Sequence, residues 1–92
     1  MRNSQTPSEK REALMRHIEG AIRVDGILRP RHVEVMAGLN RVTLYRKVRD
    51  GLFPPPLLLG EAAVPGAPIG WRASTVAAWL ASRPQAKGGK AA

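Results

Sequence analysis

Cysteine is absent from this chain of 92 residues, which excludes a disulfide framework and a thiolate metal site. Acidic residues are scarce, since 7 Asp and Glu stand against 15 Lys and Arg, and the formal net charge is +8. No stretch of about eighteen apolar residues occurs, and residues 1–14 contain no apolar run of signal-peptide length. We therefore expect a soluble, cytoplasmic protein without a membrane partner.

The short length limits the kinds of activity to expect. A chain of this size forms one small domain, which leaves little room for an enzyme pocket. We expect no enzymatic activity, cofactor, metal or small-molecule ligand, and we expect surface or helix-end roles for the only histidines, His17 and His32. The positive charge predicts a polyanionic partner, either nucleic acid or an acidic membrane surface, although a merely basic surface is also compatible with it.

Residues 7–22 are predicted to form a helix. Thr6, Pro7 and Glu9 match a capping box, in which Thr6 and Glu9 satisfy each other's backbone amides. One stripe of this helix is apolar and consists of Leu14, Ile18, Ala21 and Ile22. The stripe either packs on the rest of the domain or pairs with the same helix of a second subunit, and we favour the first.

Residues 29–51 are predicted to form two short helices joined by a tight turn. The first spans residues 30–37 and ends at Gly38, which is suited to a left-handed conformation. The second spans residues 41–50, with Asn40 as its N-cap and Gly51 after its end. Their inner faces are apolar and contain Val33, Leu39, Leu44 and Val48. This pattern is typical of a helix-turn-helix.

The outer side of the second helix is basic. It has no acid before Asp50, whereas an ordinary solvated helix face mixes the two signs of charge, so we favour a nucleic-acid-binding face. The expected outer residues are Arg41, Val42, Thr43, Arg46 and Lys47.

After this helix, three prolines enforce an extended exit at residues 52–56. Residues 57–59 and 69–72 are predicted to form a β-hairpin with a long loop, and a final helix is expected from about Ser74 to Ser82. Phe53, Trp71 and Trp79 are expected in the core rather than stacked on bases. The prediction is therefore a mainly α fold with a small β-hairpin: a winged helix-turn-helix with an added N-terminal helix.

Several motifs in order carry a resemblance to a known family. They are GLNR at 38–41, TLYR at 43–46, DGLFP at 50–54, GWRAS at 70–74, and Val76 with Trp79 and Leu80. In these motifs the chain closely resembles the AlpA family of prophage regulators, which are similar in fold to MerR-type regulators and phage excisionases. The resemblance covers residues 27–83. It leaves an N-terminal tail and amphipathic helix at 1–26, and a basic tail at 84–92 that we expect to be disordered.

The resemblance implies a sequence-specific, double-stranded DNA-binding protein of a phage or mobile element. Such a protein acts as a transcriptional regulator, as an excisionase-like recombination directionality factor, or as both, and it would be nucleoid-associated. The family's motif places Arg41, Thr43, Tyr45 and Arg46 on the DNA. The loop at 60–68 lacks Lys and Arg, which departs from the family, and Arg72 at the base of the wing is then the candidate for a wing-side phosphate contact.

The individual roles follow from side-chain chemistry. Arg41 and Arg46 can each offer a bidentate fork to guanine, whereas Lys47 and Arg49 suit phosphate. The hydroxyl of Tyr45 suits phosphate, with packing as the alternative. The full candidate set for DNA binding is Asn40, Arg41, Val42, Thr43, Tyr45, Arg46, Lys47, Arg49 and Arg72.

One such module covers only about a half-site, so a homodimer or a DNA-dependent oligomer is expected. Two alternatives remain open. One is the DNA-recognition subunit of a phage assembly, such as the small subunit of a packaging motor. The other is a basic adaptor that binds acidic proteins or membrane.

Overall fold

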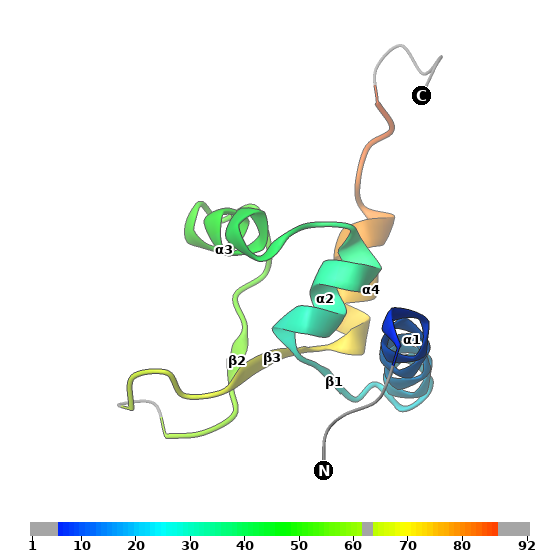
Figure 1. Ribbon diagram of the computed structural model, residues 1–92. Helices are drawn as coiled ribbons and strands as arrows, with labels where there is room; N and C mark the ends of the chain where they lie inside the picture. Colours follow the sequence, from blue (N-terminus) through cyan, green and yellow to red (C-terminus); the bar gives the residue numbers. More distant parts are fainter. Residues whose placement is uncertain (1–5, 62–63, 87–92) are drawn as a thin grey trace.

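The computed structural model describes residues 6–61 and 64–86. Its elements are, in chain order, α1 (Pro7–Val24), β1 (Ile27–Leu28), α2 (Pro30–Ala37), α3 (Arg41–Arg49), β2 (Leu57–Leu58), β3 (Ile69–Arg72) and α4 (Ala73–Ala81). The predicted mainly α fold with a winged helix-turn-helix is confirmed (Figure 1). Residues 84–86 have no regular structure, and the rest of the expected disordered tail, like residues 1–5, lies outside the described residues.

Helix α1 begins at the predicted capping box. The amide of Thr6 donates to Glu9 Oε1 at 2.8 Å, and the amide of Glu9 donates to Thr6 Oγ1 at 3.2 Å. The helix runs two residues further than predicted and ends at Asp25, which is left-handed with φ 55°. Ile18 and Ala21 are buried, but the prediction for Ile22 was wrong, because this residue is 50% exposed.

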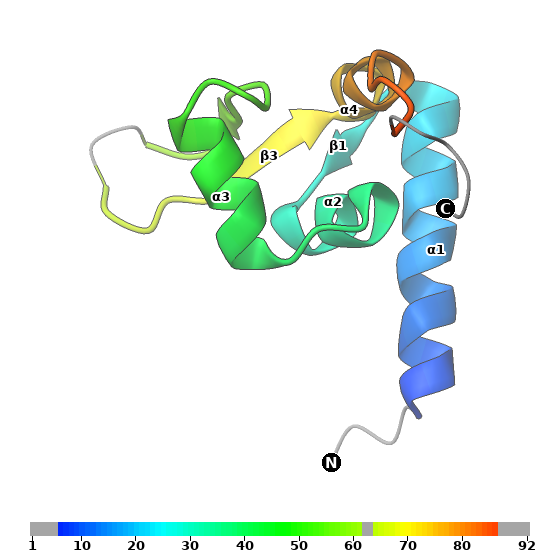
Figure 2. The ribbon, with the colours of Figure 1, turned by 90° about the horizontal axis from the view of Figure 1, so that it is seen from above.

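The apolar stripe of α1 packs on the same chain. Helix α1 contacts α2 and α4, as the first of the two alternatives predicted. Its first turns extend past the rest of the domain, on the side away from α3 (Figure 2). The stripe is therefore used inside the domain, which leaves it less available for pairing with a second subunit.

The helix-turn-helix forms as its caps predicted. Gly38 ends α2 with φ 71°, a left-handed conformation that costs glycine little. Asn40 then caps α3 through Oδ1, which accepts the amide of Thr43 at 2.8 Å. Leu44 and Val33 are fully buried, and Leu39 and Val48 pack against them. These contacts fix the angle at which α3 leaves the domain.

The predicted two-stranded hairpin is a three-stranded antiparallel sheet in the order β1-β3-β2. No strand was expected before residue 57, but Leu28 pairs with Trp71 and Ile27 with Arg72. Two residues are too few to show the alternation by which a strand is recognised in a sequence, so this strand was missed. Strand β3 is central because it pairs with both neighbours.

An aromatic cluster joins the sheet to the end of α3. Phe53 and Trp71 are 2% and 1% exposed, and their rings meet edge to face with centroids 5.7 Å apart. Trp71 Nε1 donates to the carbonyl of Pro54 at 2.7 Å, and Trp79 Nε1 donates to that of Leu52 at 2.8 Å. The predicted core role is confirmed for Phe53 and Trp71, whereas Trp79 is partly buried and packs against the core. The indole N–H groups of the two tryptophans hold the proline-rich exit in place.

His32 differs from the prediction of a surface residue, since it is only 3% exposed. Its Nδ1 accepts the amide of Arg29 at 3.0 Å, so the helix-end part of the prediction is right. The ring of His17 stacks on it with centroids 3.9 Å apart. Burial, followed by the nearby charges of His17, Arg31 and Arg29, lowers the pKa of His32 from 6.5 to about 4.

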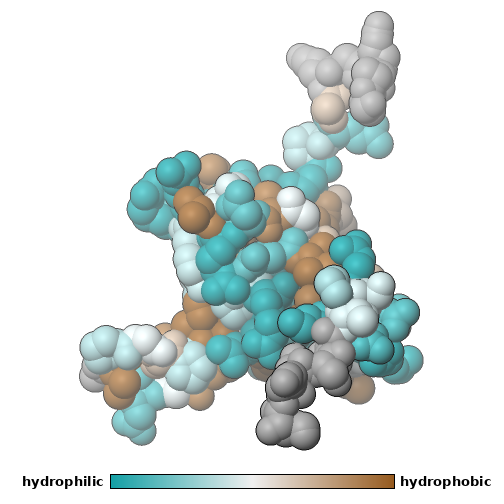
Figure 3. Space-filling model, in the orientation of Figure 1, coloured by the Kyte–Doolittle hydropathy of each residue, from teal (hydrophilic) through white to brown (hydrophobic). Residues whose placement is uncertain are grey.

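Helix α3 and the described parts of the wing loop, residues 59–61 and 64–68, lie on one side of the molecule, and α1 lies on the other (Figures 1 and 2). The surface over α3 is mainly hydrophilic with a few hydrophobic residues between (Figure 3). None of the helices in the described ranges is both long and apolar enough to pass through a bilayer.

Candidate nucleic-acid interface

Successive residues of an α-helix are rotated by about 100°, which sorts the candidate side chains of α3 into three rows. Leu44 marks the inward direction because it is fully buried. The row opposite to it consists of Val42, Arg46 and Arg49, which are exposed. We call these three residues the outer row.

The outer row combines one apolar side chain with two arginines. Val42 is 59% exposed, which suits contact with a thymine methyl group. The side chain of Arg46 makes no hydrogen bond to another described residue, so its planar fork is available for a guanine. Arg49 instead pairs with Asp50 at 2.9 Å, and this contact raises the pKa of Arg49 and lowers that of Asp50. Only Arg46 therefore offers an unengaged guanidinium in the centre of this row.

Arg41 and Tyr45 form a second row, one turn apart on the flank that faces the wing. The Nε–H of Arg41 donates to Glu34 Oε2 of α2, and Tyr45 is 41% exposed. The hydrogen bond to Glu34 is the main reason for the raised pKa of Arg41. The structure thus turns Arg41 toward α2 and the wing rather than toward the outer row.

Thr43 and Lys47 form the third row, on the opposite flank, and both are partly buried. Asn40, directly before the helix, uses its side-chain oxygen for the N-cap. Its first role is therefore to begin α3. Its side-chain amide nitrogen remains to donate a hydrogen bond to a ligand.

Arg72 lies apart from the other candidates. It ends β3, at the opposite end of the strand from the wing loop, and pairs there with Ile27. It also lies near Asp25, whose pKa is lowered mainly by hydrogen bonds from Ser74 and additionally by the charge of Arg72. The structure brings the remaining candidates together on or beside α3, but it does not bring Arg72 to them.

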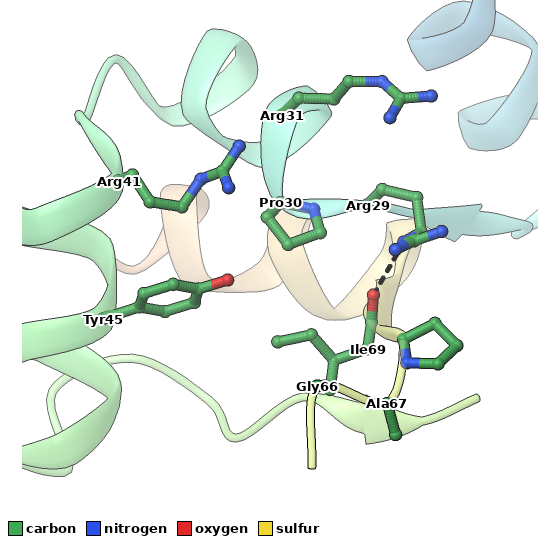
Figure 4. Close-up of a pocket in the computed structure, with 9 residues that line it drawn as sticks. Arg29, Pro30, Arg31, Arg41, Tyr45, Gly66, Ala67 and Ile69 are labelled. Carbon is green, nitrogen blue, oxygen red and sulfur yellow. Dashed lines mark hydrogen bonds between the residues drawn. The ribbon is translucent and has the colours of Figure 1, made fainter. Parts of the chain in front are cut away.

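Arg29 and Arg31 were absent from the sequence prediction, and the structure places them beside the second row. With Arg41, Tyr45 and residues 66–69 they line a cavity of about 300 Å³ (Figure 4). Arg29 reaches the wing through its Nε–H, which donates to the carbonyl of Ile69 at 2.9 Å. No local pattern indicates this contact, because its partners are 40 residues apart in the chain.

Metal chemistry has no support in the described part of the chain. There, no group of three or more His, Cys, Asp or Glu side chains is placed to hold a metal ion. The His17–His32 stack is a packing contact that joins α1 to α2.

The three rows of α3, the wing beside it and the three-stranded sheet define a winged helix-turn-helix protein. The sequence model of the family described as prophage CP4-57 regulatory protein (AlpA) matches residues 26–84. The chain belongs to this family of phage-associated DNA-binding regulators.

A phage protein is also similar to the chain. The uncharacterized protein ORF88 of Enterobacteria phage P4 is 41% identical over 56 residues, which are 61% of this chain and 58% of that protein. The chain thus matches little more than half the length of this relative. No solved structure matches the chain.

Proposed function

We propose that the protein binds double-stranded DNA in a sequence-specific manner and thereby regulates transcription, excision of a mobile element, or both. The outer row carries this proposal, because it presents an unengaged arginine fork and an apolar contact on the most exposed line of α3. Membership of a family of phage regulators supports it. This function places the protein in the cytoplasm, with the DNA.

The binding geometry follows from the sizes of the two partners. An α-helix with its side chains is about 10–12 Å across, and the major groove is about 12 Å wide. Helix α3 inserted with its outer row toward the groove floor would therefore meet base edges with Arg46 and Val42. Its two flanks would meet the phosphates of the two groove walls, so Arg41 and Tyr45 face one strand and Lys47 the other.

The sequence preference of Arg46 is testable with a charge-preserving variant. A site is first selected from random duplexes, and then wild type, Arg46→Lys and Arg46→Ala are titrated with selected and scrambled duplexes. We expect Arg46→Lys to lower the ratio of specific to non-specific affinity by about 5- to 150-fold, because the bidentate contact is worth about 1–3 kcal/mol. Arg46→Ala should also weaken binding to the scrambled duplex.

Arg23→Ala is the matched control, since Arg23 is an exposed arginine at the end of α1, away from α3. Its affinity ratio should equal that of wild type. Unchanged ratios for both Arg46 variants would refute the role of Arg46, and the failure of wild type to select any sequence would refute the proposed function.

Transcriptional and excision roles need a cellular readout. A promoter reporter and an excision assay, each run with wild type and Arg46→Ala, separate the two. Loss of either signal in the variant assigns that role to DNA recognition by α3, and equal signals from variant and wild type in both assays would contradict the proposal.

A further inference from the structure

The cavity beside α3 lies where three segments meet. Its lining comes from the start of α2, the first turns of α3 and residues 66–69 of the wing (Figure 4). Its volume of about 300 Å³ is large enough for a phosphate group but is unsuited to a large ligand. We call this cavity the wing notch.

Three of the nine residues that line the wing notch are arginines, and none of the nine is acidic. Arg41 and Tyr45 point into it from α3, and Arg29 lies beyond Pro30, with its guanidinium turned toward the carbonyl of Ile69 (Figure 4). Arg31 lies on the rim, and its guanidinium points along the surface toward α1. Glu34, which holds Arg41, is the acid in contact with this group.

Two of the arginines are pre-positioned by their Nε atoms. Arg29 is fixed to the carbonyl of Ile69, and Arg41 is fixed to Glu34. A guanidinium has five N–H donors, so both arginines have donors left after these Nε–H bonds. The hydroxyl of Tyr45 adds a neutral donor. Donors fixed in advance lose less conformational entropy when they bind an anion.

The position of the wing notch indicates which anion it meets. It lies along the flank of α3 formed by Arg41 and Tyr45, about a quarter turn from the outer row. When the outer row faces the floor of the major groove, this flank faces one wall, and the wall is made of phosphates. The wing loop itself contains no Lys or Arg, so Arg29 supplies the positive charge at the wing.

We propose that the wing notch is a socket for one backbone phosphate of the bound DNA, held by Arg29, Arg41 and Tyr45. This inference rests on the proposed function. The socket sets the depth and register of α3 in the groove, and it replaces the contact that a basic wing tip would make. Arg29 is a tether of the wing and a phosphate ligand at once.

The test combines single-phosphate neutralisation with a minimal variant. Each phosphate of the selected duplex is replaced in turn by an uncharged methylphosphonate, and binding of wild type, Tyr45→Phe and Arg31→Ala is measured. For wild type we expect one phosphate on one strand whose neutralisation weakens binding about tenfold, as for a lost hydrogen bond to a charged group. Tyr45→Phe should weaken binding to the native duplex by about the same factor.

The decisive result is the coupling between the two changes. In Tyr45→Phe, neutralising the same phosphate should lower the affinity for DNA by a clearly smaller factor than in wild type, because the variant has already lost the contact with that phosphate. In Arg31→Ala, neutralising this phosphate should lower the affinity by the same factor as in wild type, since the guanidinium of Arg31 points away from the notch. Independent effects of Tyr45→Phe and the phosphate, or coupling to Arg31 alone, would overturn the socket.

Free inorganic phosphate presents the same oxygen atoms to the wing notch as a backbone phosphate does. Inorganic phosphate and chloride are therefore compared as competitors of DNA binding at equal ionic strength. Competition by inorganic phosphate that Tyr45→Phe reduces locates the anion in the wing notch, and coupling of Tyr45 to one duplex phosphate assigns the notch to the DNA backbone. Such competition without that coupling would overturn the socket in favour of a free-anion site. If wild type selects a sequence through Arg46 but no phosphate couples to Tyr45, the socket fails while the proposed function stands.

Discussion

Glu34 limits the DNA affinity of α3 at the scale of a single residue. Its carboxylate accepts a hydrogen bond from Arg41, and the side chains of the pair are 25% and 51% exposed. An ion pair this exposed contributes little to stability, about 0.2–1 kcal/mol. The carboxylate also places a negative charge beside the expected path of a phosphate backbone.

Glu34→Gln should therefore tighten binding to specific and scrambled duplexes alike by about two- to fivefold, which corresponds to the energy of such a pair. The dependence of affinity on salt should become steeper, because the glutamine oxygen still accepts the Nε–H of Arg41 while the negative charge beside the phosphate is removed. Glu19→Gln is the matched control, since Glu19 is exposed on α1. Weaker binding by Glu34→Gln would show that the negative charge of Glu34, and not only its hydrogen bond, is needed to hold Arg41 in position.

His32 makes stability depend on pH. Its folded pKa of about 4 lies below 6.5, so the unfolded chain binds more protons between these values. The contribution of neutral His32 is fully present above pH 6.5 and is lost as the pH falls toward 4. The loss should be on the order of 1–3 kcal/mol in the free energy of unfolding.

His32→Gln tests this contribution. Glutamine at this position of the helix is able to accept the amide of Arg29, as in a capping box, but does not titrate. Urea unfolding at pH 7 and pH 4.5 should show a smaller difference in midpoint for the variant than for wild type. Equal differences would assign the acid sensitivity to other groups.

At the scale of elements, β1 adds a third strand to the predicted two-stranded hairpin. It runs antiparallel beside β3, and a Cβ on Gly70 would lie 2.6 Å from Ile27 Cγ2 and 3.0 Å from the carbonyl oxygen of Leu28. The first distance is shorter than real Cβ atoms show, and the second is a tight contact with backbone, which does not give way easily. The glycine is therefore needed for the close approach of the two strands.

Gly70→Ala should lower the free energy of unfolding by about 1–3 kcal/mol, as overpacking of a core does. Gly20→Ala is the control, because nothing lies within 4 Å of its Cβ position and alanine favours a helix. Denaturant unfolding of both variants gives the comparison. A loss of stability in Gly20→Ala as large as that in Gly70→Ala would contradict the role of strand contact.

At the scale of the whole molecule, the two sides of the domain have different tasks. The side with α3 and the wing carries the candidate interface, and α1 covers the far side by packing on α2 and α4 (Figure 1). Ile18 and Ala21 are buried by this packing. A second copy thus finds little of the apolar stripe left to pair with, although one module covers only about a half-site.

We therefore expect copies to assemble on DNA rather than in its absence. Sedimentation of the free protein should give a monomer, and duplexes that contain two half-sites should bind two copies cooperatively. A duplex with one half-site is the control and should bind one copy. A stable dimer without DNA would contradict this expectation, and a ring of many copies would support the packaging-subunit alternative.

The sequence by itself determined the helix-turn-helix and the face that it buries. The capping residues Thr6 and Asn40, the left-handed Gly38 and the inward Leu44 are local signals, read within one or two helical turns. Such signals act between near neighbours in the chain, so they can be recognised without knowledge of the fold. The strand and turn signals after the second helix predicted the wing, and the family motifs agree with it.

The tertiary structure alone decided which candidate residues meet. It added β1 to the sheet, buried His32, turned Arg41 toward Glu34, joined Arg29 to Ile69, and placed Arg72 away from α3. Most of these outcomes depend on contacts between segments distant in the chain, which no local period or cap encodes. For this reason the sequence was enough to predict that α3 is basic and binds nucleic acid. Only the fold showed that its outer row and the wing notch are two different surfaces.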